Sequence, residues 1–236
     1  MKYSKTKKYD PTFLAPRMMG PNAMKLVEEL TAGLPLLPGM RVMDLGCGMG
    51  LTSVFLAQEY GLQVFATDLW IPATANYQTF LAAGVSAIPI HADATDLPYA
   101  DEYFDAIISV DSYHYYGREE RFMDEKIASL VKPGGIIALV LPGLKEEFSV
   151  IPEEFKPYWD NDDVLATMHS LPWWQSLLCK SRSITVDTIA EMAGFDECWA
   201  DWLACTDNEY AVTDKIVMDK GAGKYMNLIK VIARKK

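Results

Sequence analysis

Val-Met-Asp-Leu-Gly-Cys-Gly-Met-Gly, residues 42–50, is the stretch from which the fold of this chain can be inferred. The apolar run 41–45 is typical of a buried strand, and residues 51–57 have the pattern of a helix. The three alternate glycines between them predict a tight turn, because glycine adopts positive φ and lets a ligand approach the backbone. A strand, a glycine turn and a helix N-terminus form a nest of N–H groups where parallel sheets bind nucleotides.

The spacing of the glycines indicates which nucleotide is bound. Dinucleotide-binding turns have the pattern G-x-G-x-x-G and hold a pyrophosphate. Here Gly46, Gly48 and Gly50 form G-x-G-x-G, and Leu51 stands where the third glycine would be. Asp44 lies two residues before the first glycine, and a carboxylate at that point repels a phosphate but attracts an ammonium group. An NAD-dependent oxidoreductase is therefore the less favoured alternative.

A second acidic residue follows at the distance expected for a nucleoside site. Asp68 ends a predicted strand, 63–67, about 20 residues after the glycines, where an acidic side chain accepts the two ribose hydroxyls. Leu69 and Trp70 come next, and either side chain could cover an adenine ring. Dehydrogenases share this feature, so Asp68 predicts a bound ribose but does not by itself argue against a dehydrogenase.

Three further stretches complete a family pattern. With residues 42–50 and 63–68, the segments 91–99, 103–109 and 132–135 resemble, in order, the motifs of class I S-adenosylmethionine (SAM) methyltransferases. The resemblance covers residues 40–142, and over 15–142 the chain is similar to the bacterial ubiquinone/menaquinone-biosynthesis-like methyltransferases. It implies an α/β, Rossmann-like SAM-methyltransferase fold: a seven-stranded, mostly parallel sheet with an antiparallel last strand and helices on both faces.

The same resemblance implies a cofactor, S-adenosyl-L-methionine, which leaves as S-adenosyl-L-homocysteine, and a set of residues that bind it. The amino acid end is assigned to the glycine loop, the ribose and adenine to the strand ends, and the adenine amino group to the carboxylate at position 93. The implied cofactor-binding residues are Asp44, Gly46, Cys47, Gly48, Gly50, Asp68, Leu69, Asp93, Ala94 and Ser109.

Polar and aromatic residues fill positions 110–117, which face the transferred methyl group in this fold. His114 is the candidate base, because an unperturbed histidine titrates near pH 6.5. Asp111 is a candidate ligand for a cationic substrate or a group that orients the base, and Tyr113 a hydrogen-bond or cation–π partner. The alternative is that His114 only begins the next helix and bonds to the backbone.

The chain divides into four predicted parts. Residues 1–21 form a lead-in whose basic start, 1–8, is expected to be mobile, and 22–142 form the SAM-binding core with a helix at 118–131. Residues 143–182 are rich in aromatic side chains and prolines, which favours a lid over the substrate site or a decoration packed into the core. Residues 183–236 complete the sheet through a helix at 185–195 ended by Gly194, a strand at 198–205 and an antiparallel strand at 225–233.

Composition limits the partners. The 236 residues are half apolar and carry a net charge of −10, although seven of the 22 basic residues lie in 1–8 and 234–236. An acidic protein surface repels nucleic acid and anionic membranes, and it suits neutral or cationic small molecules. The alternative is that the negative charge only keeps the protein soluble. No apolar run reaches membrane-spanning length. Four scattered cysteines and three histidines indicate neither disulfides nor a metal site, so a cytoplasmic protein is expected.

The sequence therefore predicts a SAM-dependent methyltransferase with a small-molecule methyl acceptor, and leaves the oligomeric state open. An amine acceptor is favoured, because residues 111–116 resemble the corresponding run of amine N-methyltransferases and because aromatic faces hold ammonium groups. A non-catalytic SAM-binding protein is the alternative from another class.

Overall fold

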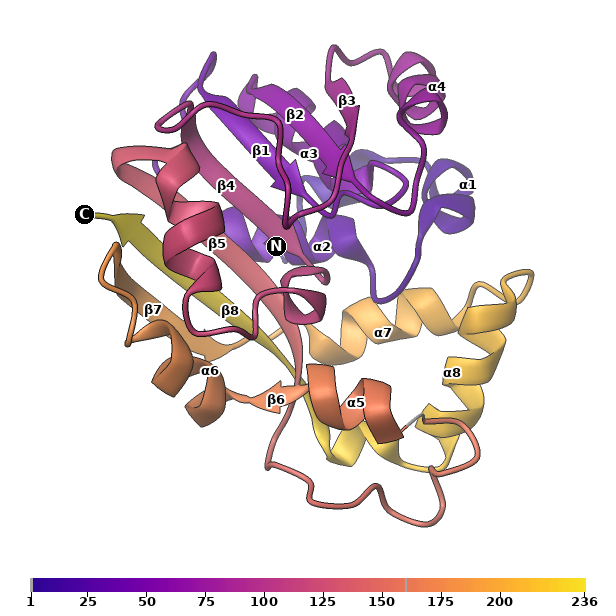
Figure 1. The fold of residues 1–236 in the computed structure, drawn as a ribbon. Coiled ribbons are helices and arrows are strands. Elements are labelled where there is room, and N and C mark those ends of the chain that lie inside the picture. The colour runs from indigo at the N-terminus through magenta and orange to yellow at the C-terminus, as the bar shows by residue number, and fades with distance from the viewer. Residues whose placement is uncertain (1, 160) are drawn as a thin grey trace.

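One mixed sheet organises the molecule. The computed structural model describes residues 2–159 and 161–236, with the side chains of 161–163 excluded. Seven strands follow the order β3-β2-β1-β4-β5-β8-β7, and β6 pairs with β5 (Figure 1). The strands are β1 Arg41–Leu45, β2 Gln63–Asp68, β3 Ile88–His91, β4 Phe104–Val110, β5 Val131–Leu144, β6 His169–Ser170, β7 Ile184–Glu191 and β8 Met226–Lys235.

The pairing confirms the predicted architecture. Strands β1 to β5 pair in parallel, as does the short β6 with β5, whereas β8 runs antiparallel to both β5 and β7. The two-residue β6 makes eight strands where seven were expected. Because β1 and β4 are neighbours, the turns that follow them meet at the carboxyl edge of the sheet, where the order reverses.

Helices cover both faces of the sheet. Side chains alternate across β4 and β5, so Ile108 and Val140 belong to one core cluster and Ile107 and Leu139 to the other. The first cluster includes α2, α3 and α7, and the second includes α6 and the turns after β4. The helices are α1 Pro11–Leu14, α2 Ala23–Thr31, α3 Leu51–Tyr60, α4 Ala73–Ala83, α5 Asn161–Thr167, α6 Leu171–Leu178, α7 Phe195–Leu203 and α8 Glu209–Asp219.

Residues 184–205 differ from the prediction. Most of the predicted helix at 185–195 lies in strand β7, because a run of β-branched residues over 184–189 suits a pleated strand that pairs with β8. The predicted strand at 198–205 is instead helix α7, whose buried Cys198, Trp199 and Trp202 share one helical face. Gly194 therefore stands before a helix and not after one.

Two more expectations fail. The predicted helix at 118–131 is a π-helical turn, Met123–Ile127, followed by a 3-10 turn and the start of β5. The basic N-terminal segment, expected to be mobile, is docked. Glu28 of α2 accepts hydrogen bonds from the backbone N–H groups of Lys5 and Thr6 and from the Thr6 hydroxyl, at 2.7–3.0 Å. Tyr3 is buried and donates to Glu29 at 3.0 Å.

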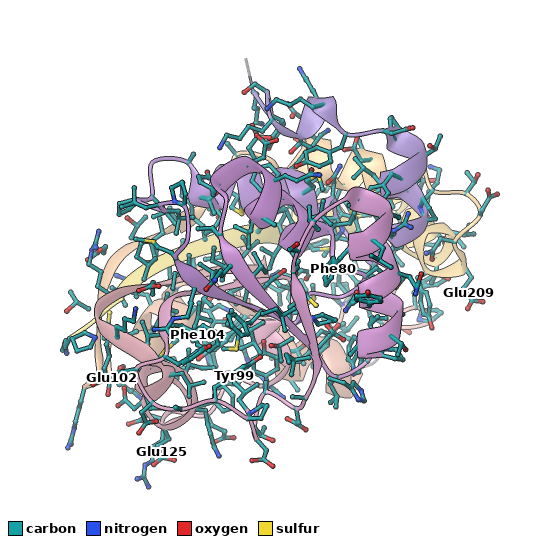
Figure 2. The ribbon with its side chains drawn as sticks, turned by 90° about the horizontal axis from the view of Figure 1, so that it is seen from above. Phe80, Tyr99, Glu102, Phe104, Glu125 and Glu209 are labelled. Atoms are coloured by element: carbon teal, nitrogen blue, oxygen red, sulfur yellow. The ribbon has the colours of Figure 1, made fainter. Side chains whose placement is uncertain are left out.

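An aromatic cluster supports the strand ends that face the site. Tyr99 and Phe104 lie together in Figure 2, with ring centroids 4.8 Å apart, and both rings contact Phe65 of β2. The Tyr99 hydroxyl lies 2.7 Å from the Thr67 hydroxyl. The cluster therefore holds the end of β2 in place at Thr67, just before Asp68.

Within the described ranges, every helix is too short or too polar to cross a membrane. The same ranges contain no cluster of three His, Cys, Asp or Glu residues arranged to hold a metal ion.

Replacing Glu28 with glutamine is expected to lower the free energy of unfolding by about 1–2 kcal/mol at pH 7, since charge-assisted acceptors are weakened. Burial raises the pKa of Glu28, but the bonds from Thr6 and Lys5 outweigh it and hold the pKa below its usual value. A depressed folded-state pKa stabilises above the unfolded value, about 4.3, and that stability disappears as the pH falls through the folded value.

Urea unfolding of the parent, Glu28→Gln and the exposed control Glu119→Gln measures this effect. The Glu28 difference should shrink as the pH falls below the unfolded-state pKa, about 4.3, and vanish below the lowered folded-state pKa, and Glu119→Gln should match the parent throughout. Equal stability of all three proteins at pH 7 would show that the N-terminal segment is not held by Glu28.

Candidate functional site

A cavity of about 380 Å³ opens at the carboxyl edge of the sheet. Its walls come from five places in the chain: the N-terminal segment at 17–21, the glycine loop, and the segments that follow β2, β3 and β4. The loop between α1 and α2, which carries residues 18–22, dips toward α7 (Figure 1), and the Asn22 N–H donates to the Cys198 carbonyl at 3.0 Å. The cavity therefore lies where the β1 and β4 turns meet, as the topology predicts.

The glycine positions of the loop are packed so closely that a side chain would not fit at Gly46 or Gly50. Gly46, Gly48 and Gly50 all have positive φ, at 72°, 52° and 85°. A Cβ atom added to Gly46 would lie 1.8 Å from Ser112 Oγ, and one added to Gly50 would lie 2.7 Å from the Phe80 ring. The loop thus depends on glycine both for its backbone shape and for its contact with the segment after β4.

Asp68 holds this loop from the end of β2. Its Oδ2 accepts the Gly48 N–H at 2.8 Å, and its Oδ1 accepts the N–H groups of Trp70 and Ile71, each at 2.8 Å. The side chain is nearly buried yet lines the cavity. Because a carboxylate has about four acceptor sites, a ligand's hydroxyl groups can still reach it.

Asp44 lies beneath the loop and not in the cavity wall. It is fully buried, and its Oδ2 accepts the hydroxyls of Thr52 and Ser53 at 2.6 and 2.5 Å. Burial raises the pKa of Asp44 to about 6, against the lowering effect of the two hydroxyls. Its Oδ1 has no hydrogen-bond partner among the described residues. Asp44 therefore supports the first turn of α3 through Oδ2, while its charge lies close beneath the glycine loop.

The remaining predicted cofactor residues divide between the cavity and its surroundings. Cys47, Leu69, Asp93 and Ala94 line the cavity; the Asp93 Oδ1 accepts the Thr95 N–H and hydroxyl, each at 2.7 Å, which lowers its pKa. Ser109 is buried behind the wall, 3.4 Å from the Tyr116 hydroxyl.

Asp111 also lines the cavity, from the segment that follows β4. This residue follows β4 with a left-handed backbone, φ 57°, which is uncommon outside glycine. A Cβ added to Gly20 would lie 2.7 Å from its Oδ2, so the N-terminal segment covers the carboxylate closely. Burial raises the pKa of Asp111 to about 7, and the charge of Asp214 adds to the effect.

His114 and Tyr113 lie outside the cavity lining. His114 is buried in a 3-10 turn, and burial together with the Arg118 charge lowers its pKa to about 3, so the expected titration near pH 6.5 does not hold. Tyr113 is fully buried, and its ring packs against Tyr116, Phe122 and Trp174.

Several residues of the cavity wall carry no local signal in the sequence. Arg17, Met18 and Met19 come from the N-terminal segment, and all three line the cavity. Across the wall, the Trp70 and Tyr115 rings meet edge to face, with centroids 5.1 Å apart. Both are exposed, so they form an aromatic pair at the cavity.

The aromatic segment 143–182 contributes none of its described residues to the cavity lining. Its Phe155 and Trp174 are completely buried, and Arg118 donates to the Ala166 carbonyl of α5. The described part of this segment packs into the core, while the N-terminal segment forms the wall that a lid would supply.

The site fits the cofactor that the sequence predicts. It offers a loop of backbone N–H groups where a Cβ would not fit, a carboxylate at the end of β2 and a buried, unpartnered carboxylate oxygen on Asp44. Apolar side chains at Leu69 and Trp70 lie beside them, partly exposed. Such a set suits a ribose, an aromatic base and a positively charged group better than a phosphate chain.

Comparison with known proteins agrees with this geometry. Residues 42–135 match a family described as a methyltransferase domain. Glycine/sarcosine/dimethylglycine N-methyltransferase of Actinopolyspora halophila is 30% identical over 121 residues, which cover 50% of this chain and 21% of that protein. Several O-methyltransferases match at comparable identity. The chain spans less than half the length of these curated relatives.

Solved structures share the fold. Phosphoethanolamine N-methyltransferase 2 of Haemonchus contortus, in complex with phosphomonomethylethanolamine and S-adenosylhomocysteine, has a TM-score of 0.74 at 21% identity; the match covers 97% of this chain and 58% of that chain. The [4+2]-cyclase SpnF has a TM-score of 0.70 at 16% identity, over 97% and 94% of the two chains. The chain therefore shares the fold of these solved methyltransferase structures, and its residues 42–135 match a methyltransferase domain.

Proposed function

We propose that this protein transfers a methyl group from SAM to a small amine. The observation that carries the proposal is one cavity whose lining includes the glycine loop, Asp68 and Asp111. A donor bound on the loop and an acceptor bound at Asp111 would share this cavity. Methyl transfer needs this alignment and exclusion of water more than it needs covalent help from the enzyme.

On the cofactor side, Gly46, Cys47 and Gly48 would hold the amino acid end, and Asp68 the ribose hydroxyls. Asp93 and the Ala94 N–H, which both border the cavity, would read the adenine. Asp44, Gly50 and Ser109 lie outside the cavity lining. They would hold the glycine loop and the end of β4 in place. When bound, the cofactor supplies an electrophilic methyl group on a sulfonium.

On the acceptor side, a carboxylate and two aromatic rings face the same space. Asp111 attracts an ammonium group, and the rings of Trp70 and Tyr115 present faces that bind cations. The two N-methyltransferase relatives support an amine, and the O-methyltransferase relatives mark oxygen as the competing acceptor atom. His114 and Tyr113, predicted as catalytic, would act through packing behind Asp111.

The second candidate is a SAM-binding protein without methyl transfer. The specific observation in its favour is the likeness to a cyclase over nearly the whole chain, because a shared fold does not fix the reaction. Formation of S-adenosylhomocysteine in the presence of an acceptor separates the two functions.

Asp68→Ala is expected to weaken S-adenosylhomocysteine binding about 10- to 100-fold, since charge-assisted hydrogen bonds contribute about 1.5–3 kcal/mol and Asp68 also anchors the Gly48 N–H. Calorimetric titration measures the affinity, with the exposed Asp96→Ala as control and NAD⁺ in a parallel cell. Parent-like affinity in Asp68→Ala, or preferential binding of NAD⁺, would contradict the cofactor assignment.

Asp111→Asn is expected to lower kcat/KM for amines about 10- to 100-fold by removing a charge-assisted contact, while S-adenosylhomocysteine affinity stays the same. The assay measures S-adenosylhomocysteine formed with glycine, sarcosine, dimethylglycine and phosphoethanolamine. Asp101→Asn, an exposed change at the other end of β4, serves as the control. The acceptor assignment fails if the Asp111 variant keeps full kcat/KM for every amine that the parent methylates.

A further inference from the structure

A small opening lies between Gly20 and the carboxylate of Asp111, and both residues line the cavity. A Cβ atom added to Gly20 would lie 2.7 Å from Asp111 Oδ2 and 3.9 Å from its Cγ. Apart from the residues next to Gly20 in the chain, no other described residue places an atom within 4 Å of that point. The opening is therefore bordered by the carboxylate on one side and by a residue without a side chain on the other.

The backbone at Gly20 does not itself require glycine. Gly46, Gly48 and Gly50 have positive φ, whereas Gly20 does not, so a residue with a side chain could adopt its conformation. What a side chain at position 20 would change is the space beside Asp111 Oδ2. Glycine at this position is thus explained by the site and not by the turn.

The segment that carries Gly20 is held in place from both ends. Met18 is buried before it, and Asn22 is buried after it. The Asn22 N–H donates to the Cys198 carbonyl at 3.0 Å, and its Nδ2 donates to the Asp201 carboxylate at 2.7 Å. The segment is thereby anchored to α7, toward which its loop dips in Figure 1, and Gly20 keeps its place against the carboxylate.

The backbone of Asp111 is held as well. Its N–H donates to the Val140 carbonyl of β5 at 2.9 Å, and its φ of 57° lies in the left-handed region, which aspartate adopts more readily than most residues. Since both backbones are fixed, a Cβ at position 20 would be accommodated by rotation of the carboxylate and not by separation of the two segments. The room beside Oδ2 is therefore set by residue 20.

The degree of substitution of an ammonium group determines how much room it needs at a carboxylate. A primary ammonium has several N–H donors and can reach the oxygens from many directions. A tertiary ammonium keeps a single N–H, so its alkyl groups must fit beside the oxygen that accepts it. The Trp70 and Tyr115 rings line the same cavity and suit such groups, because aromatic faces bind alkylated ammonium ions.

We propose that Gly20 is a specificity-determining residue of the acceptor site, because the opening beside it admits the alkyl groups of secondary and tertiary amines to the Asp111 carboxylate. The inference rests on the proposed function, since it requires an amine acceptor. It extends that function to amines that already carry methyl groups, so one site methylates the same nitrogen repeatedly. A side chain at position 20 would close the opening and favour primary amines.

The same step serves each round of methylation. The ammonium proton is released to water, and the nitrogen electron pair forms the bond to the methyl carbon. The carbon–sulfur bond breaks, and its electrons stay on sulfur. Only the number of alkyl groups beside Asp111 differs between rounds, which is why the opening and not the chemistry decides how far methylation proceeds.

The test compares kcat/KM of the parent and Gly20→Ala for the faster of glycine and phosphoethanolamine and for its N-methyl and N,N-dimethyl forms. The parent should methylate all three forms. Gly20→Ala should lower kcat/KM for the dimethyl form about 10-fold or more relative to the primary amine, the scale on which a pocket distinguishes one methyl group. S-adenosylhomocysteine affinity should stay the same, which also verifies folding; Gly20→Ser is the second variant if alanine fails that check.

Gly223→Ala is the matched control. Gly223 also lacks a positive φ, and its added Cβ would meet the flexible end of Met218 at 3.2 Å, outside the cavity lining. This variant should keep the parent's selectivity among the three amines.

Urea unfolding tests the contact independently of turnover. The effect of Gly20→Ala on stability should be less favourable in the parent than in Asp111→Ala, which lacks the carboxylate that the new Cβ would displace. An equal effect in both backgrounds would show that residue 20 does not press on Asp111.

The kinetic outcomes separate the inference from the function on which it rests. Equal losses for all three amines in Gly20→Ala, or parent-like kcat/KM for the dimethyl form, would overturn the specificity role. Turnover of the primary amine alone by the parent would overturn it too. S-adenosylhomocysteine binding by a parent that methylates no amine would overturn the proposed function, and the inference with it.

Discussion

The contact between the Gly46 backbone and Ser112 is the constraint on which the site depends. A Cβ atom at position 46 would lie 1.8 Å from Ser112 Oγ, so the turns after β1 and β4 meet only because the loop has no side chain there. Asp68 then holds the same loop from β2 through the Gly48 N–H. Three neighbouring strands are thereby tied together at one edge, and Asp111 and the glycine loop line the same cavity.

Several carboxylates lie at this edge of the sheet, and their surroundings give them different pKa values. Asp93 keeps a lowered pKa because it accepts from Thr95 at the surface, whereas burial raises the pKa of Asp44 and Asp111 to about 6 and 7. Gathering several acidic groups in a partly dry space is unfavourable without a cation. The proposed ligands, a sulfonium donor and an ammonium acceptor, would both supply positive charge to this space.

The sequence predicts the first half of the fold well because its signals are local. Buried strands end in glycine turns or acidic residues; β1 has the predicted bounds, and α3 begins at the predicted Leu51. The prediction for residues 184–203 was wrong because the sequence at 184–189 combines β-branched residues, which favour a strand, with a spacing that also fits a helix. The strand that pairs with this segment, β8, lies at the far end of the chain.

Burial and distant contacts explain what the sequence could not predict about the site. His114 has the residue type of a base, but only the folded structure reveals that it is buried with a pKa of about 3. The glycine loop, Asp68 and Asp111 could be predicted from their places after the strands, because those signals are local. The part of the N-terminal segment in the cavity lining could not, because it arises from contacts between distant parts of the chain.

The central claim is that methyl groups leave this cavity on nitrogen. The most direct measurement is NMR of reactions supplied with SAM carrying a ¹³C-labelled methyl group and paired acceptors, each amine beside its alcohol analogue, since N-methyl and O-methyl carbons are resolved from one another. The account predicts label on nitrogen, lost or strongly reduced in Asp111→Asn. Label on oxygen alone, or none transferred by a protein that binds S-adenosylhomocysteine, would contradict it.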